Sequence, residues 1–494
     1  MKEMDHFLLS TLGFPALGLF CYRFLCSKSL PPGPPSFPIV GSLFSLRQPL
    51  HRHFAELSRR YGPLIYLKIG MVPFLVVNDA RTAEVVFKVH DVEFADRGRS
   101  EYFRLFSFDW KDMVFGPYGN LWKRMRKISV MHLFSNKMVN SSTDYRRSEL
   151  QIAIQSILQC HKQGKPVRVR KIMGNYVSGN TSLTLFGKKG LEAAVGILDQ
   201  MSSQALNLNV GQLIPALDRF DLHGMNAKMQ NKFLPPLKAI IDDIIEEHKL
   251  NKAQVGSDKF VPKDFTDVLI SLEKEDALED ISIVALLADM IAAALETTIS
   301  ALEWMMAEIA NNPQVVKKAQ DELDKVIGKG RLVEESDLMS LPYIEAIVKE
   351  TLRLHPPLPL ALPHFSRKEA MVNGYRIPAG CTMLINIWAI GRDQTYWSEP
   401  EVFRPERFLK NQAGIIGQNF NVIPFSAGRR RCPGYPLALR SMGFVLASLL
   451  QAFNWNPEGK ICLEEDKGTV TSHLASELLL VASPRIEEHL LIPA

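Results

Sequence analysis

The chain has 494 residues, of which 46% are hydrophobic and 22% are charged. It can therefore bury a large core and does not have the composition of a disordered protein. The net charge of +5 is small, which argues against nucleic-acid binding. Six cysteines in a chain of this length do not form a disulfide framework. They include no CxxC pair, which argues against a zinc site.

An apolar segment opens the chain. Phe7–Tyr22 carries no charge, and the apolar character continues to Cys26 with one interruption at Arg23. This length just suffices to cross a bilayer if Arg23 reaches the interface. Because positive charge follows the segment, we expect residues 1–28 to be a single membrane anchor with the rest of the chain in the cytosol. A cleaved signal peptide is the alternative.

A proline-rich stretch, residues 29–39, follows the anchor. Its prolines and glycine cannot continue a helix, so we expect an extended hinge. No long linker, low-complexity tract or repeat occurs after it. Residues 40–494 are therefore predicted to form one large catalytic domain.

The domain is predicted to be mainly α with small β-sheets. Residues 64–69 and 74–77 are typical of strands and are separated by Gly70. Apolar stripes at helical spacing run from about residue 79 to 349.

One helix is expected to cross the core. It begins at Asp280, ends near Asn311 and is apolar on almost every side. Beyond it, residues 374–380 indicate a hairpin, residues 381–387 a strand, and residues 436–453 a last helix.

The strongest motif is Phe425-Ser-Ala-Gly-Arg-Arg-Arg-Cys-Pro-Gly434. It is a glycine-containing loop that brings Cys432 to the start of the last predicted helix. The helix N-terminus and the neighbouring arginines favour the thiolate over the thiol. On the residues alone, an inert core cysteine remains an equal alternative.

This motif fills every fixed position of FxxGxRxCxG, and the chain resembles the cytochrome P-450 superfamily, in particular the plant A-type enzymes. Gly116-Pro-Tyr-Gly-Asn-Leu-Trp-Lys and Asn386-Ile-Trp-Ala-Ile-Gly-Arg-Asp are similar to the same group. The resemblance implies a long central helix over a buried heme b (iron protoporphyrin IX), with Cys432 as the axial ligand of the iron. Such a thiolate favours cleavage of the O–O bond.

Glu350-Thr-Leu-Arg353 and Phe403-Arg-Pro-Glu-Arg407-Phe match two further motifs of the family. By resemblance, Glu350, Arg353 and Arg407 form a structural triad behind the heme. Taken alone, the first pair is an ordinary i,i+3 ion pair on a helix surface.

Ala293-Ala-Leu-Glu-Thr-Thr298 resembles the oxygen-binding segment of the central helix, with Ala294 in place of the customary glycine. A threonine in mid-helix can bond back to the preceding turn and open a bulge. By resemblance, Thr297 and Glu296 deliver protons to the bound oxygen. The alternative is that both face a neighbouring helix.

The heme propionates need cationic or hydrogen-bonding partners. Trp122 and Arg126 match the family's WxxxR motif, and Arg430 is the arginine of the cysteine motif. His364 stands where many plant members carry arginine and is expected to donate a hydrogen bond, with a surface histidine as the alternative.

The substrate pocket is expected between residues 103–115 as an aromatic roof, 287–298 as one wall, and 358–362 and 472–478 as the rest. These segments are mostly apolar, which predicts a mostly apolar, small organic substrate. Basic residues near the motifs predict a docking surface for an acidic reductase, or simply a solvated basic face: Lys123, Arg124, Lys127, Arg429 and Arg431.

The resemblance therefore implies a monooxygenase of the endoplasmic reticulum membrane. O2 is its co-substrate, and a flavoprotein NADPH–cytochrome P-450 reductase supplies electrons from NADPH, with cytochrome b5 as a second donor. Its expected substrate is a phenylpropanoid, flavonoid, alkaloid or terpenoid. The alternatives are a heme-thiolate enzyme that couples, dehydrates or rearranges its substrate without net hydroxylation, and a non-catalytic membrane-tethered scaffold or heme sensor.

Overall fold

The computed structural model describes residues 30–492 except 99, 205–209, 257–258, 273–276, 411–413 and 468–469. The predicted anchor, residues 1–28, lies outside the described residues. The helices are α2 (Leu50–Tyr61), α3 (Ala80–Lys88), α4 (Glu101–Phe106), α5 (Asn120–His132), α6 (Asn136–Ser141), α7 (Thr143–Lys162), α8 (Val169–Phe186), α9 (Glu192–Gln204), α10 (Val210–Leu213), α11 (Met225–Lys228), α12 (Leu234–Val255), α13 (Phe265–Leu269), α14 (Asp280–Asn311), α15 (Pro313–Val326), α16 (Pro342–Leu354), α17 (Ile387–Ile390), α18 (Glu406–Lys410), α19 (Tyr435–Ala452) and α20 (Glu488–Leu491). Short 3₁₀ or π segments are η1 (Leu43–Ser45), η2 (Pro215–Phe220), η3 (Met229–Phe233) and η4 (Glu335–Ser340).

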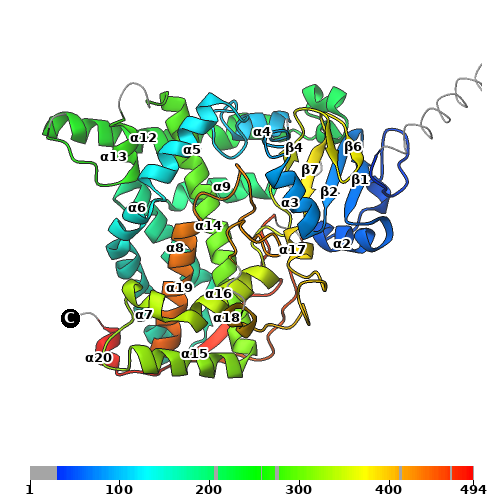
Figure 1. Cartoon of the computed structure of the whole chain (residues 1–494). Helices are drawn as coiled ribbons and strands as arrows, with labels where there is room; N and C mark the ends of the chain where they lie inside the picture. The colour runs from blue at the N-terminus through cyan, green and yellow to red at the C-terminus, as the bar shows by residue number, and fades with distance from the viewer. Residues whose placement is uncertain are drawn as a thin grey trace, which may run out of the picture.

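The described strands form three small sheets. The strands are β1 (Leu64–Ile69), β2 (Val72–Val77), β3 (Val167–Arg168), β4 (His364–Phe365), β5 (Ala370–Val372), β6 (Tyr375–Ile377), β7 (Thr382–Ile385), β8 (Phe453–Pro457) and β9 (Leu479–Pro484). The sheets have the orders β1-β2-β7-β4, β3-β9-β8 and β5-β6. Two of the sheets, with β1, β2, β4, β6 and β7, lie on the right of Figure 1 beside the larger helical part, whereas β8 and β9 of the remaining sheet pack on helices α14, α19 and α7. The predicted class, mainly α with small β-sheets, is therefore confirmed.

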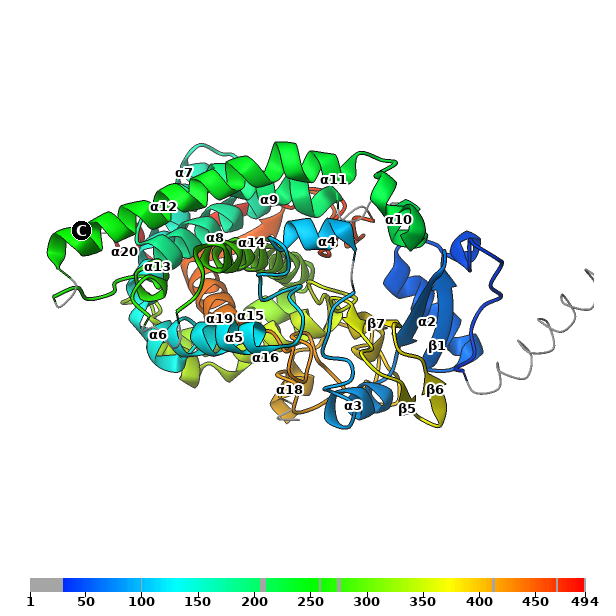
Figure 2. The ribbon, with the colours of Figure 1, turned by 90° about the horizontal axis from the view of Figure 1, so that it is seen from above.

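Helix α14 passes through the middle of the helical part, beneath α12 and α9 in Figure 2. It packs against α8, α16 and α19, and most of its side chains are buried, among them Leu287 and Trp304. Its mostly apolar sequence has this cause, because most of the helix surface packs against neighbouring elements. The predicted start at Asp280 and end at Asn311 agree with the structure.

Helix α14 is also the one helix among the described residues that is long and apolar enough to cross a membrane. Its most apolar window is 61% buried inside the protein. It is therefore a core helix of the domain and says nothing about the predicted anchor.

The predicted hairpin is present but begins earlier. Strands β5 and β6 pair antiparallel around Asn373 and Gly374, both of which have positive φ. Residues 378–380 lie beyond it and lead into β7, where Phe74 of β2 pairs with Thr382 in parallel register. The pairing brings the segment after α16 against the first sheet and so forms one wall of the cavity described next.

Candidate active site

A cavity of about 280 Å³ lies between α14, α8, α19 and two loops. Its floor contains Cys432 from the loop before α19. Ala293, Ala294 and Thr297 of α14 line it, and Met113 and Val114 of the loop between α4 and α5 contribute a further wall. Four segments that are far apart in the sequence therefore meet around one thiol.

The loop before α19 has a fixed shape around Cys432. The backbone N–H of Cys432 donates to the carbonyl of Phe425 at 3.0 Å. Gly428 has φ +68°, and a Cβ there would lie 2.5 Å from Oδ1 of Asp91. Glycine is required at this position because a side chain would collide and because the left-handed backbone disfavours other residues.

The Cys432 thiol faces opposing influences. Burial raises its pKa, while backbone hydrogen bonds from Gly434 and Tyr435 and the charges of Arg126 and Arg431 lower it. Burial prevails, so the predicted preference for thiolate is not seen for the side chain by itself. A bound metal cation would reverse this balance, because a coordinating thiol is deprotonated outright.

Three guanidinium groups line the same cavity, those of Arg97, Arg126 and Arg430. Burial lowers the pKa of Arg430 to about 10 and that of Arg97 well below its ordinary value. The hydrogen bonds described for Arg97 all go to backbone carbonyls, those of Val114, Leu362 and Pro363 at 2.8–3.1 Å. Such buried positive charge is costly without an anionic partner.

Arg430 is held in the same way. It donates to the carbonyls of Ala95 at 2.7 Å, Met113 at 3.2 Å and Gly116 at 2.5 Å. Its guanidinium carbon lies 4.7 Å from the centre of the Trp122 ring. The Trp122 Nε1–H donates to the carbonyl of Met113 at 3.0 Å. This bond fixes the Trp122 ring, whose face lies against the Arg430 guanidinium.

His364 lines the cavity, but its second ring nitrogen, Nε2, can only accept a hydrogen bond there. Its Nδ1 lies 2.9 Å from the carbonyl of Phe94, and a carbonyl can only accept, so Nδ1 carries the hydrogen. Burial and the charge of Arg97 lower the pKa of His364 to about 3. In the neutral ring Nε2 then has no hydrogen to offer, so the expected donation toward the cavity is not available in this arrangement.

Thr297 and Glu296 point to different surroundings. Thr297 lines the cavity, and its hydroxyl donates to the carbonyl of Ala293 at 2.6 Å. The predicted back-bond is present, but α14 stays a continuous α-helix, so the predicted bulge is not.

The Glu296 carboxylate instead accepts from Arg170 at 2.9 Å and lies 2.7 Å from Nε2 of His473. It is not among the described residues that line the cavity. Burial raises the pKa of Glu296, but His473 and Arg170 outweigh burial and lower it below its ordinary value.

The other predicted walls are met in part. Leu358, Ala361 and Leu362 line the cavity. The aromatic residues of the predicted roof pack on one another, as Phe103 and Phe115 do at 4.6 Å between ring centres. Residues 472–478 are absent from the described lining, and the carbonyl of Ser472 instead accepts a hydrogen bond from Trp304 Nε1 at 3.1 Å.

The residues of the predicted triad meet around the Glu350 carboxylate. Glu350 and Arg353 are buried, and the Glu350 carboxylate accepts from Arg353 at 2.7 and 2.8 Å. It also accepts from Nε of Arg407 at 2.9 Å and from the backbone N–H of Arg404 at 2.8 Å. The side chains are on α16 and α18 and do not line the cavity.

Several of the basic residues near the motifs already have partners. Arg124 donates to the carbonyl of Ala277, Arg429 pairs with Asp91 at 3.3 Å, and Arg431 donates to the carbonyl of Ile416. Lys123 is exposed and lies over the Tyr118 ring. Asp91 is the one anionic partner among these three described partners, so the surface keeps most of its positive charge.

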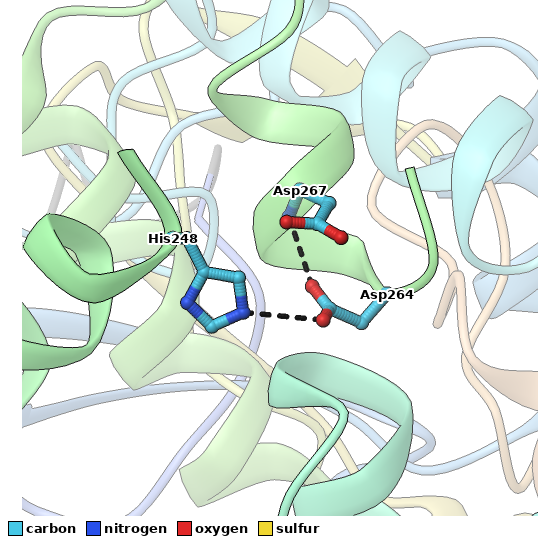
Figure 3. Close-up of side chains that lie close together, drawn as sticks. All are labelled: His248, Asp264 and Asp267. Carbon is cyan, nitrogen blue, oxygen red and sulfur yellow. Dashed lines mark hydrogen bonds and ion pairs between the residues drawn. The ribbon is translucent and has the colours of Figure 1, made fainter. Parts of the chain in front are cut away.

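A second polar cluster, shown in Figure 3, lies outside the cavity and joins α12 to α13. His248 Nδ1 is 2.7 Å from the carbonyl of Ile244, and Nε2 is 3.1 Å from Asp264. The Asp264 carboxylate also accepts from the backbone N–H of Asp267. The Asp267 carboxylate accepts from the backbone N–H of Lys263. These bonds need a proton on each ring nitrogen and occupy the carboxylates as helix caps, so the cluster has a structural role.

Sequence reasoning missed Arg97, Asp289, Arg170 and His473. Asp289 is the one acid among the described residues that line the cavity. An acid in the apolar stretch of the central helix was the available signal for it, because such a group is buried only where it has partners. The others lie in segments without a motif, and only the fold brings them to the site.

The residues of the cavity match the needs of a heme. A flat macrocycle with two carboxylates would supply anionic partners for the guanidinium groups of Arg97, Arg126 and Arg430, and the remaining lining is mostly apolar. Cys432 offers a soft sulfur ligand for iron. This complementarity concerns charge and donor type and specifies no position for the ring.

Comparisons with known proteins agree with this chemistry. The family model described as cytochrome P-450 matches residues 31–480. The chain is 36% identical to flavonoid 3'-monooxygenase of Petunia hybrida, over 98% of this chain and 99% of that protein. It is 36% identical to flavonoid 3'-monooxygenase of Arabidopsis thaliana, over 97% and 96%. It is 37% identical to tabersonine 16-hydroxylase 1 of Catharanthus roseus, over 91% of each.

Proposed function

Because this chain belongs to the cytochrome P-450 family and is a monooxygenase of the plant type, we propose that it oxidises a small, mostly apolar specialised metabolite. The observation that carries the proposal is a single thiol and three guanidinium groups, two of them buried, around one apolar cavity. Flavonoids and alkaloids, which the relatives' names indicate, are the first candidate substrates, beside phenylpropanoids and terpenoids.

Heme is the cofactor implied by the family. Cys432 would ligate its iron, and Arg97, Arg126 and Arg430 would bind its carboxylates, with Trp122 stacked on Arg430. When bound, the heme supplies oxygen activation and electron uptake. The protein supplies a dry apolar cavity that holds the substrate and excludes bulk water.

Thr297 and Glu296 are proposed to supply protons. The Thr297 hydroxyl lies in the cavity wall and can turn from the Ala293 carbonyl to donate into the cavity. Glu296 is 29% exposed and is held by Arg170 and His473, so it has contact with solvent. Rotation of its side chain away from Arg170 and His473 would remove the interactions that keep the carboxylate ionised. It could then take a proton from solvent and pass it toward Thr297.

We also propose that residues 1–28 anchor the protein in the endoplasmic reticulum membrane, with residues 29–39 as the hinge. Apolar side chains are exposed on the first sheet and its surroundings, among them Phe44 at 81% and Met71 at 54%. The N–H of Met71 bonds to Leu213 of α10, and Phe220 nearby in sequence is 56% exposed. Exposed apolar side chains in this region support contact with a membrane.

The partners follow from the reaction. NADPH–cytochrome P-450 reductase is proposed to dock over the cysteine loop, where Lys123 and Arg429 are exposed. Cytochrome b5 is a second proposed donor. Steering by such charges weakens as salt is added.

The first experiment is spectroscopic. The reduced, carbon monoxide-bound protein should show the red-shifted band of thiolate-ligated heme, and Cys432→Ser should lose both band and turnover. An unaltered spectrum and undiminished product in the variant would overturn the proposal. Absence of heme in the wild-type protein would favour the scaffold.

The second experiment identifies the reaction. Membranes carrying this protein and a plant reductase are incubated with pooled flavonoids, alkaloids and terpenoids, with and without NADPH. We expect products that are heavier by one oxygen atom and that require NADPH. Product formed without NADPH would instead indicate rearrangement or dehydration.

A further inference from the structure

A pair of buried carboxylates joins the central helix to the loop over the cavity. Asp289 of α14 is 5% exposed and Asp112 of the loop is 1% exposed, and their side chains are hydrogen-bonded to each other. Oδ2 of Asp289 accepts the amide hydrogens of Met113 and Val114 at 2.8 and 3.1 Å. Asp112 accepts those of the next two residues at 3.0 and 2.6 Å. The two acids thus bind every amide of residues 113–116.

This contact requires a proton. Two carboxylates can hydrogen-bond to each other only if one of them is protonated. Oδ2 of Asp289 already accepts from two amides, so Oδ1 is the oxygen of Asp289 that remains for Asp112. Burial, followed by the charge of Asp112, raises the pKa of Asp289 well above its ordinary value, and burial raises that of Asp112 to about 6. At neutral pH the pair therefore holds one proton between its two carboxylates.

Charged groups face the pair from the opposite side of the loop. Arg430 binds the carbonyls of Met113 and Gly116, and Arg97 binds that of Val114. Residues 112–116 are therefore fixed by acids through their amides and by arginines through their carbonyls. Behind the arginines lie His364, which is neutral, and Asp96, whose carboxylate pairs with Arg367 at 3.1 Å.

We propose that Asp112 and Asp289 share one proton and act as a clasp for residues 112–116, with Asp289 as a positioning residue for the cavity. While the proton is present, the clasp holds the loop against α14 and keeps Arg97 and Arg430 in place. Loss of the proton leaves two adjacent buried negative charges, which repel each other. The loop then separates from α14, and the cavity loses its shape at alkaline pH.

The proposal is tested on the heme-loaded full chain without substrate, so its outcome is independent of which metabolite is oxidised. Asp289→Asn keeps an oxygen that accepts the two amide hydrogens, and its NH2 donates to Asp112 without a removable proton. Asp289→Ala removes both functions. The pair of variants therefore separates the shared proton from the mere presence of a side chain.

The first readout is hydrogen–deuterium exchange of peptides covering residues 107–119, normalised to a peptide of α16 at each pH. In the wild-type protein, protection should fall between neutral and alkaline pH. Asp289→Asn should stay protected at both. Asp289→Ala should exchange faster at both by roughly tenfold or more, because lost buried hydrogen bonds raise the population of the open state. The same pH-dependent loss in Asp289→Asn would overturn the proposal.

The second readout is infrared spectroscopy of the proton itself. The wild-type protein should show the carbonyl stretch of a protonated carboxylic acid at neutral pH, and the band should disappear in Asp289→Asn. Asp96→Asn is the matched control, since Asp96 is 6% exposed and accepts from the amide of Tyr118 in the same region. The band should survive there. Its absence from the wild-type protein, or its persistence in Asp289→Asn, would overturn the shared proton.

Discussion

Replacing Glu350 by glutamine tests whether the buried triad holds the fold together. The carboxylate is 0% exposed and accepts from Arg353, from Arg407 and from the N–H of Arg404. Glutamine keeps the shape, but its NH2 group would face guanidinium donors. Removing one partner of a buried ion pair costs about 3–5 kcal/mol, so we expect a loss of about 4 kcal/mol in the free energy of unfolding.

This loss converts into a measurable temperature shift. Unfolding entropy scales with length, which for 494 residues gives about 1 kcal/mol per kelvin if the domain unfolds as one unit. The unfolding temperature should therefore fall by about 4 °C. The assay is a thermal scan of the heme-loaded protein, followed by circular dichroism and by heme absorbance.

The control lies on the same helix. Glu345 pairs with Lys349 at 2.8 Å, but its side chain is 63% exposed. Exposed i,i+4 pairs contribute less than about 0.5 kcal/mol, so Glu345→Gln should shift the unfolding temperature by less than about 1 °C. Equal shifts in the two variants would refute the reasoning. Lost pigment in Glu350→Gln without a lower unfolding temperature would show that the triad serves the cofactor instead.

Three further predictions follow from the site and its surroundings. Thr297→Ala should consume NADPH and oxygen with less product and more peroxide, and full product yield per NADPH would contradict its proton role. Gly428→Ala should lose heme and about 1–3 kcal/mol of stability, as judged by pigment content and denaturant midpoint, whereas an unchanged midpoint would mean that the loop relaxes freely. Burial lowers the pKa of His248, but Asp264 and the Ile244 carbonyl raise it overall above 6.5; its stabilisation is therefore complete below that pH and lost as pH rises through the folded-state pKa. His248→Gln should accordingly destabilise the protein more at about pH 5.5 than at about pH 8.5, and equal losses in denaturation at both would argue against a charged His248.

The long helix and the cysteine loop could be predicted because their signals are local. The mostly apolar stretch from Asp280 to Asn311 has one simple explanation, burial of most of the helix surface. Gly428 and Gly434 around Cys432 form a motif that can be recognised within one short stretch of sequence, without knowledge of any residue elsewhere in the chain. Contacts between distant segments could not be read in this way.

Arg97 shows the limit most clearly, because its partners Leu362 and Pro363 are more than 260 positions away. The direction of Glu296 was likewise beyond reach, since it depends on Arg170 and His473 from other elements. His364 was expected to donate into the cavity, and only the carbonyl of Phe94 reveals its tautomer. In each case the spatial neighbour decides the chemistry.

The double attachment of residues 112–116 bears on how such an enzyme can acquire new substrates. This stretch of backbone holds Arg97 and Arg430 through its carbonyls, so a mutation that reshapes it endangers cofactor retention as well as selectivity. Substitutions that change substrate selectivity should therefore accumulate at lining residues that do not hold Arg97 or Arg430, for instance at Ala294 and Leu358. A library randomised at those two positions should yield many pigmented clones, and one randomised within 112–116 should yield few.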